Sequence, residues 1–330
     1  MRAAVCRSYG PPEIVRVEEI PPPALQAGQV RVRVGAASVN FPDVLLIADK
    51  YQMSVPTPFV PGSEFAGVVA EVAEDVRDFT TGDRVAGTGL VGAFAEETVV
   101  ATRAITRVPD TVDDRLAAAF GVAHRTAYHA LRSMARVQPG EELVVLGAGG
   151  GVGLAAVEIG VLLGASVTAV ASSGAKLEAA AARGARNLVN HRSAALRESL
   201  RDSLPGGADV VIDPVGGDLA EPALRALRWG GRFVTVGYAS GVVPRIPLNL
   251  VLLKGTRVLG FQLRDLATHL GDEFRRNEAE LTGLLAERRL LPHVGAVFPL
   301  GDVAAALRHV ADGQAIGKVV LDVAETASAP

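Results

Sequence analysis

Glycines are concentrated at one point of the chain, in the segment Leu143–Gly153, which reads LVVLGAGGGVG. An apolar run precedes these glycines and a helix-like run follows them, which is the order strand, turn, helix. Such a turn lets backbone N–H groups approach a pyrophosphate, and the helix N-terminus adds a partial positive charge. The alternative is that the glycines serve only the close packing of helix on strand. We predict a dinucleotide site formed by Gly147, Gly150, Gly151 and Gly153.

The choice of dinucleotide depends on the charge at the end of the second strand. An acid about 20 residues beyond the glycines would hold the ribose hydroxyls of NAD. The sequence there, Ala169–Lys176, reads AVASSGAK and contains no acid. We predict that Ser172, Ser173 and Lys176 meet the 2′-phosphate of NADPH, because an acid at this place would repel that phosphate. A solvated lysine at the start of a helix is the alternative.

Strands and helices alternate around this motif. Strand-like runs lie at 142–146, 166–171, 188–190, 210–213 and 232–236, and helix-like runs at 151–163, 176–183, 194–200 and 219–227. This alternation predicts an α/β domain with a doubly wound parallel sheet. Ten of the 19 prolines fall in the first 109 residues among short β-branched runs, which predicts a β-rich first domain. We expect the strand-like run 318–323 to return to that domain.

Length and composition narrow the class of protein. A chain of 330 residues with an apolar fraction of 49% fits two domains with large cores. The net charge of -3 lacks the basic excess that nucleic-acid binding requires. Cys6 is the single cysteine, so neither an internal disulfide nor a cysteine-rich zinc cage is possible. Signal-peptide and membrane-span patterns are absent, and we expect a cytoplasmic protein.

Six ordered motifs carry a family likeness: SVNFPD at 38–43, PGSEFAG at 61–67, TAY at 126–128, the glycine segment, DPVGG at 213–217 and GKVV at 317–320. With them the chain resembles the zinc-free quinone oxidoreductases, a branch of the medium-chain dehydrogenases/reductases, along nearly its whole length. The resemblance implies a GroES-like catalytic domain of residues 1–122 and 263–330 and a Rossmann domain of residues 123–262. It also implies NADPH as the cofactor and a homodimer, which we expect to pair around 248–253 and 256–261.

The same resemblance implies further residues near NADPH, namely Thr126, Val152, His191, Gly237, Tyr238 and Lys318. Position 191 departs from the family, where many relatives have a tyrosine. Here His191 is followed by Arg192, and both can donate to phosphate, so we expect the affinity to depend on pH near neutrality. A surface histidine without a role is the alternative.

Zinc is not expected. The positions that hold the catalytic zinc in alcohol-dehydrogenase relatives match Asn40, Ser63 and Val122, and none of these is a good zinc ligand. Without a metal that polarises a plain ketone, the acceptor must already be electron-poor. A quinone fits, as does an enone or an enoyl thioester.

Asn40 and Tyr51 are the candidate catalytic residues. The Asn40 amide would donate to the oxyanion that develops on the acceptor, and the Tyr51 hydroxyl would orient the substrate or deliver a proton. The alternatives are an Asx turn or strand cap for Asn40 and simple packing for Tyr51. We expect Asp43 and Glu64 to be structural, because an ionised carboxylate beside a growing oxyanion is unfavourable.

Two other functions stay open. One is a 2-enoyl thioester reductase similar to an acrylyl-CoA reductase, which would perform the same chemistry on a carrier-bound acid. The other is an NADPH-binding structural protein, similar to a crystallin, without turnover. The intact glycines and Lys176 do not separate these three functions.

Overall fold

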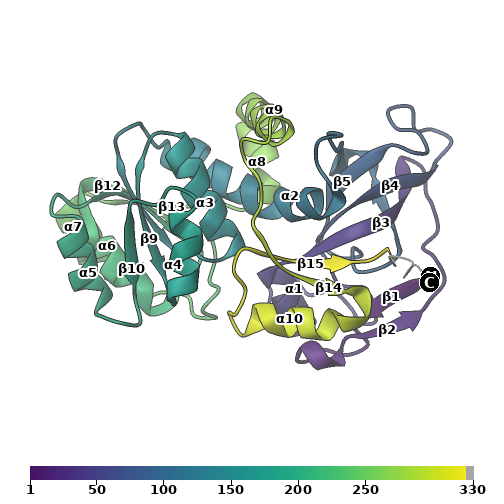
Figure 1. The fold of residues 1–330 in the computed structure, drawn as a ribbon, viewed down its shortest axis with the longest axis horizontal. Coiled ribbons are helices and arrows are strands. Elements are labelled where there is room, and N and C mark those ends of the chain that lie inside the picture. The colour runs from purple at the N-terminus through teal and green to yellow at the C-terminus, as the bar shows by residue number, and fades with distance from the viewer. Residues whose placement is uncertain (325–330) are drawn as a thin grey trace. The chain divides into compact units, whose positions relative to one another are not determined.

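The computed structural model describes residues 1–324. The chain divides into two compact units. Among the described residues, unit 1 contains 1–122 and 291–324, and unit 2 contains Ala123–Leu290. Each unit is built around a sheet of its own (Figure 1).

Unit 2 contains a six-stranded parallel sheet in the order β10-β9-β8-β11-β12-β13. Its strands are β8 (Glu142–Leu146), β9 (Ser166–Ala171), β10 (Asn187–Asn190), β11 (Ala208–Asp213), β12 (Leu227–Thr235) and β13 (Arg257–Gly260). The chain adds β9 and β10 on one side of β8 and the later strands on the other, so the order reverses between β8 and β11. Ligands of open α/β sheets bind at the carboxyl ends of the strands at such a reversal.

Helices cover both faces of this sheet. Figure 1 shows α3 (Gly151–Leu162) and α4 (Gly174–Ala181) on one face and α5 (Leu196–Ser203) and α6 (Ala220–Ala226) on the other. This double cover explains why β11 is buried at all six of its residues. The remaining helices are η3 (Ala130–Ala135), η4 (Gly217–Leu219), α7 (Leu248–Lys254), α8 (Leu263–Leu270) and α9 (Asp272–Ala286).

Unit 1 is β-rich. Its larger sheet has the order β14-β15-β3-β4-β5-β7, with β6 also paired to β3, and β1 and β2 form a separate antiparallel pair. The strands are β1 (Arg2–Val5), β2 (Arg16–Glu19), β3 (Gln29–Val39), β4 (Glu64–Val72), β5 (Arg84–Thr88), β6 (Glu97–Ala101), β7 (Ile105–Arg107), β14 (Val294–Pro299) and β15 (Lys318–Asp322). The helices are α1 (Phe41–Ile47), α10 (Val303–Ala311), η1 (Pro12–Ile14), η2 (Thr102–Ala104) and η5 (Leu300–Asp302). The expected combination of a β-rich domain with a doubly wound parallel sheet is confirmed.

Two details differ from the sequence-based expectations. Residues 263–290 group with unit 2, whereas we expected the return to the first domain at residue 263. The reason is that α9 packs on α2 (Asp114–His129). The fully buried His129 ring bonds Glu278 of α9 at 3.1 Å and stacks on Phe274 at 4.9 Å. In addition, the expected pairing segment 248–253 is helical, as part of α7.

Within residues 1–324, no helix combines the length and the apolar character that a membrane span needs.

Candidate functional site

The glycine turn joins β8 to α3 at the reversal of the sheet. Gly147 has a φ of +60°, a left-handed conformation that costs glycine little. Gly153 lies so close to the turn that a Cβ at this position would come within 2.0 Å of the Gly147 carbonyl oxygen. Gly150 is extended and α3 begins at Gly151, so glycines form the approach to the helix N-terminus. This is the backbone geometry that accommodates a pyrophosphate.

The residues predicted to meet the 2′-phosphate come together beside this turn. A Cβ built on Gly149 would lie 2.4 Å from Lys176 Cβ, so the aliphatic part of Lys176 covers the turn. Lys176 Nζ donates to Ser172 Oγ at 3.5 Å, and Ser173 Oγ caps α4 by accepting from Lys176 N at 3.4 Å. Burial and the charge of Arg192 lower the pKa of Lys176. A phosphate at this place would oppose that shift, so the chemistry of the group fits.

His191 lies at the same end of the sheet, because its backbone N–H donates to Ala171 O of β9 at 3.1 Å. Burial and the charges of Arg192 and Lys176 lower the pKa of His191. This shift favours the neutral imidazole. The expected dependence of cofactor affinity on pH stays a prediction.

Gly237 and Tyr238 follow β12 at the carboxyl edge of the sheet. Gly237 N donates to Asp213 O at 3.4 Å, which brings this segment to the end of β11. The buried Asp213 carboxylate accepts from the backbone N–H groups of Val215 and Gly216, both at 2.8 Å, and burial raises its pKa. Thr126 belongs to unit 2 as well, half-buried on α2.

Lys318, which we expected near the cofactor, lies in unit 1 and is bound to the candidate catalytic residue Asn40. Lys318 Nζ donates to Asn40 Oδ1 at 2.5 Å and to Glu64 Oε2 at 3.0 Å. The side chains of Lys318 and Glu64 are 4% and 1% exposed. β15 begins at Lys318 and β4 begins at Glu64, and both strands pair with β3, which ends next to Asn40. The sheet therefore fixes this ion pair.

The Asn40 amide is engaged within the same cluster. Its Nδ2 donates to Glu64 Oε2 at 3.2 Å, and to Ser38 O and Ser63 Oγ at 3.3 Å each. An amide NH₂ has two N–H donors, and three acceptors surround this one. In this arrangement the amide holds Glu64 and Ser63 and presents no further N–H to a ligand.

Asp43 and Glu64 anchor the backbone, as the sequence analysis expected. Asp43 Oδ2 accepts from Asn40 N at 2.7 Å and closes the first turn of α1, and Glu64 Oε1 accepts from Val122 N at 2.7 Å. Burial raises the pKa of Asp43 to about 7, although hydrogen bonds from Asn40 and Ser63 oppose the shift. Burial thus favours the protonated form of this carboxyl, which no sequence pattern indicated.

Tyr51 is half-buried in the loop after α1. Among the described residues, no hydrogen bond joins its hydroxyl to the cluster around Asn40. Its catalytic role stays a prediction.

In residues 1–324, three or more His, Cys, Asp and Glu side chains nowhere gather into a group that could hold a metal ion. The positions that match zinc ligands of relatives carry an amide in Asn40, a hydroxyl in Ser63 and the aliphatic Val122. The Lys318 ammonium lies 2.5 Å from Asn40 Oδ1, where it would repel a divalent cation. These residues do not fit zinc.

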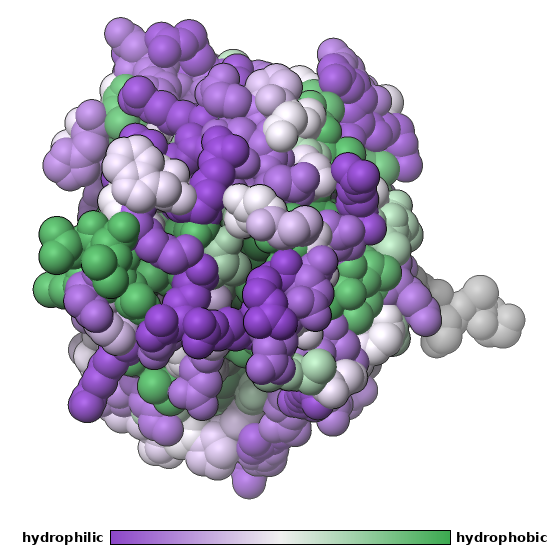
Figure 2. All heavy atoms as spheres, turned by 90° about the vertical axis from the view of Figure 1, so that its left-hand side faces the viewer, coloured by the Kyte–Doolittle hydropathy of each residue, from purple (hydrophilic) through white to green (hydrophobic). Residues whose placement is uncertain are grey.

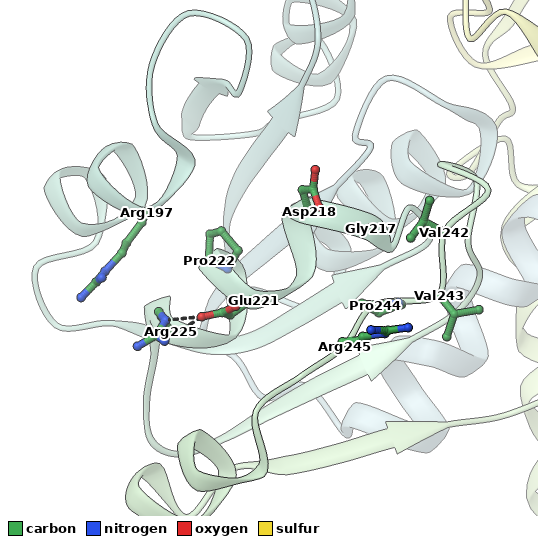
Figure 3. A pocket seen from close by; sticks show the side chains of 10 residues that line it. All are labelled: Arg197, Gly217, Asp218, Glu221, Pro222, Arg225, Val242, Val243, Pro244 and Arg245. Carbon is green, nitrogen blue, oxygen red and sulfur yellow. Dashed lines mark hydrogen bonds and ion pairs between the residues drawn. The ribbon is translucent and has the colours of Figure 1, made fainter.

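A separate open pocket of about 650 Å³ lies in unit 2 between α5, α6 and the segment 242–245 that follows β12. Figure 3 shows Arg225 paired with Glu221 in this pocket, while the side chains of Arg197 and Arg245 point in different directions. The pocket shares no lining residue with the glycine turn or with the serines and lysine beside it.

Comparison with known proteins identifies the family. The family model of the alcohol dehydrogenase GroES-like domain matches residues 26–110, and that of the zinc-binding dehydrogenases matches residues 151–280. Quinone oxidoreductase-like protein 2 of Bos taurus is 37% identical over 322 residues, which cover 97% of this chain and 92% of the relative. The chain belongs to the quinone oxidoreductase-like family of the medium-chain dehydrogenase/reductase superfamily.

Solved structures of quinone oxidoreductase-like proteins share the whole fold. Quinone oxidoreductase of Escherichia coli complexed with NADPH has a TM-score of 0.90 at 26% identity, covering 98% of this chain and 100% of that one. A mycobacterial protein complexed with NADPH has a TM-score of 0.90 at 28% identity, with the same coverage. The family resemblance and the GroES-like and Rossmann folds predicted from sequence are confirmed.

Proposed function

We propose that this protein is an NADPH-dependent, zinc-independent reductase of quinones or other conjugated carbonyl compounds. The observation that carries the proposal is the contact between Lys176 and the glycine turn. This contact lies at the end of β9, where the sequence has no acid that would repel a 2′-phosphate. Two proteins of similar fold are complexed with NADPH, which supports the same cofactor here.

In this proposal, different residues of unit 2 bind different parts of NADPH. The glycine turn and the N-terminus of α3 would hold the pyrophosphate, and Ser172, Ser173 and Lys176 the 2′-phosphate. His191 would donate one hydrogen bond as a neutral imidazole. Thr126, Gly237 and Tyr238 would line the rest of the cofactor site. When bound, NADPH supplies the hydride that reduces the acceptor.

Unit 1 would provide the acceptor side. Asn40, Ser63 and Val122 do not fit a zinc ion, so these residues offer no Lewis acid to activate a plain ketone. An acceptor with a conjugated carbonyl is already electron-poor and needs less activation. Asn40 and Tyr51 would serve this side, Asn40 by holding Lys318 and Tyr51 by orienting the acceptor through its hydroxyl.

We further propose a homodimer in which two copies meet at the β13 edge of unit 2. The strand order ends at β13, so one side of this strand has no partner strand among residues 1–324. Exposed apolar side chains lie on and beside this edge, namely Trp229, Leu248, Leu252, Leu253 and Val258, with exposures from 45% to 80%. Figure 2 faces the side on which α7 lies in Figure 1, and it shows hydrophobic spheres gathered at one margin. Such a patch typically marks an interface.

A direct assay tests the enzymatic proposal. Purified protein, freed of metal with a chelator, is mixed with NADPH and either benzoquinone or crotonyl-CoA, and the NADPH absorbance is followed. We expect benzoquinone-dependent oxidation that the chelator leaves unchanged. A preference for crotonyl-CoA would favour the enoyl thioester reductase instead. NADPH binding without turnover on either acceptor would favour a binding protein, and activity restored only by zinc would contradict the proposal.

A further inference from the structure

The Lys318 ammonium is held by two side chains of unit 1, Asn40 through Oδ1 and Glu64 through Oε2. An ammonium group carries three N–H donors, and these contacts use two of them within the described residues. The third N–H can bind a further acceptor. Because the side chain is 4% exposed, water competes little with such an acceptor.

Stability alone does not account for this ion pair. Removing two charges from water costs about as much as their attraction returns, and a well-packed apolar pair of similar volume is often at least as stable. Backbone pairing already fixes both strand ends, since Lys318 pairs with Val294 of β14 and Glu64 pairs with Thr88 of β5. The ion pair is therefore a candidate for a role beyond holding these strands together, and the remaining N–H of Lys318 is the group that can perform it.

We propose that Lys318 is a catalytic residue whose free N–H binds the acceptor oxygen that becomes negative during reduction. This inference rests on the proposed reductase function. It moves Lys318 from the cofactor side, where the resemblance had put it, to the acceptor side. Asn40 and Glu64 are then positioning residues that aim the ammonium.

The reaction balances without a metal. The hydride would leave NADPH as a C–H bond of the cofactor breaks, and it would form a new C–H bond at an electron-poor carbon of the acceptor. The acceptor π bond would break and its electron pair would move onto the conjugated oxygen. The oxyanion stays hydrogen-bonded to Lys318 and then takes its proton from water, so Lys318 begins and ends as an ammonium. One acceptor and one proton are consumed for each cofactor oxidised.

The groups around Lys318 agree with this role. Glu64 Oε2 accepts from the Lys318 ammonium at 3.0 Å and offsets its charge, while burial raises the pKa of the nearby Asp43 carboxyl to about 7. The cluster thus carries little net charge until the acceptor becomes an anion. A fixed donor that meets charge only as it develops is the arrangement that favours a transition state over a ground state.

The first experiment uses 4-nitrophenol as a stand-in for the oxyanion, because its ionised form is yellow. We expect the full-length protein to bind the phenolate and to lower the pKa of bound nitrophenol by about 1–3 units, as a nearby opposite charge does. The double variant Lys318→Met/Glu64→Gln removes both charges together and avoids an unpaired buried carboxylate. It should abolish the shift, whereas Lys254→Met, which removes a lysine bound to backbone carbonyls in unit 2, should keep it.

Kinetics provide the second readout. At saturating NADPH, the double variant should lose about 10²- to 10³-fold in kcat for benzoquinone, the usual effect of one oxyanion donor, with an unchanged NADPH Kd. Glu64→Gln alone removes the carboxylate that offsets the Lys318 charge, so it should lower the pKa of bound nitrophenol further than the wild type does. This single variant provides the test if the double variant does not fold.

Three results would overturn the inference. The first is a wild-type protein that binds no nitrophenol, or binds it without lowering its pKa. The second is a folded double variant that still lowers this pKa, and the third is a double variant that binds NADPH more weakly but keeps its kcat. Failure of the proposed function looks different, because wild-type protein would then reduce neither acceptor while the nitrophenol shift persisted.

Discussion

Lys176 lies directly against Gly149, so closely that a Cβ on Gly149 would come within 2.4 Å of Lys176 Cβ. Lysine and glycine turn thus form one surface at the end of β9, where an ammonium and the backbone amides of the turn are neighbours. A change in the turn can therefore also disturb the lysine proposed to bind the 2′-phosphate. Affinities for NADPH and NADH distinguish a substitution of Lys176 from one of Gly149.

Lys176→Ala should weaken NADPH binding by roughly 1.5–3 kcal/mol, the range for a hydrogen bond to a charged group, and leave NADH almost unchanged. Fluorescence titration of both cofactors measures this. Lys50→Ala, at an exposed lysine of unit 1, serves as the control and should change neither affinity. Equal losses for NADPH and NADH would contradict the assignment of the 2′-phosphate.

Gly149→Ala should displace Lys176 without removing it. The new methyl group overlaps Lys176 Cβ and Cγ, and Cβ moves only with the backbone at the start of α4, so Lys176 must shift as a whole residue. We expect NADPH to weaken about as much as in Lys176→Ala and NADH to weaken less, in the same titrations. Gly174→Ala is the matched control, because no atom lies within 4 Å of a Cβ there. An unchanged preference for NADPH in Gly149→Ala would show that Lys176 does not need its present position.

Tyr51→Phe and Asn40→Ala should each slow turnover without abolishing it. Water can protonate a reduced quinone, and neither side chain is then indispensable. Steady-state kcat with benzoquinone at saturating NADPH measures the effect, and the exposed Tyr9 offers Tyr9→Phe as the control. A loss above about 10⁴-fold in either variant exceeds the usual contribution of one acid or base and would refute this view of the mechanism.

Asp43→Asn should raise stability relative to the wild type more at pH 8 than at pH 5. Burial raises the pKa of Asp43 to about 7 in the folded chain, against an ordinary pKa of 3.8. Between these values the folded state binds more protons than the unfolded state, so the stability contributed by Asp43 falls as pH rises. Asparagine mimics the protonated carboxyl at every pH. Melting temperatures at both pH values measure the difference, and the exposed Asp110→Asn should show none.

Leu252→Glu should dissociate the proposed dimer, because the charge would be buried where two copies meet at the β13 edge. Light scattering after size-exclusion chromatography gives the mass. Leu188→Glu puts the same charge on an exposed leucine of β10, at the opposite edge of the sheet, and should leave the dimer intact. A monomeric wild type, or a dimer that tolerates Leu252→Glu, would exclude this interface.

Local patterns predicted unit 2 well. The strand-like runs 142–146 and 166–171 coincide with β8 and β9, because central parallel strands are buried on both faces and read as continuous apolar segments. The turn between β8 and α3 was equally visible, since only glycines satisfy its close approaches. Leu248–Leu253 misled us because a short apolar run does not distinguish a strand from a helix.

Contacts between distant segments were beyond such patterns. Lys318 and Asn40 are 278 residues apart and meet because β15 pairs with β3, a register that no local signal specifies. The one available hint was a lysine at the start of an otherwise apolar strand, KVVL. The packing of α9 on α2 could not be predicted for the same reason, because it depends on the contact between His129 and Glu278, which are 149 residues apart.

The position of β15 also constrains how the protein is made. Val319 pairs with Val39, yet every residue of unit 2 is synthesised before Val319. The second unit can therefore fold while the first still lacks its last strand and carries an incomplete edge on β3. The earliest part of the nascent chain is thus the last to close, and it is the part that a chaperone would have to protect.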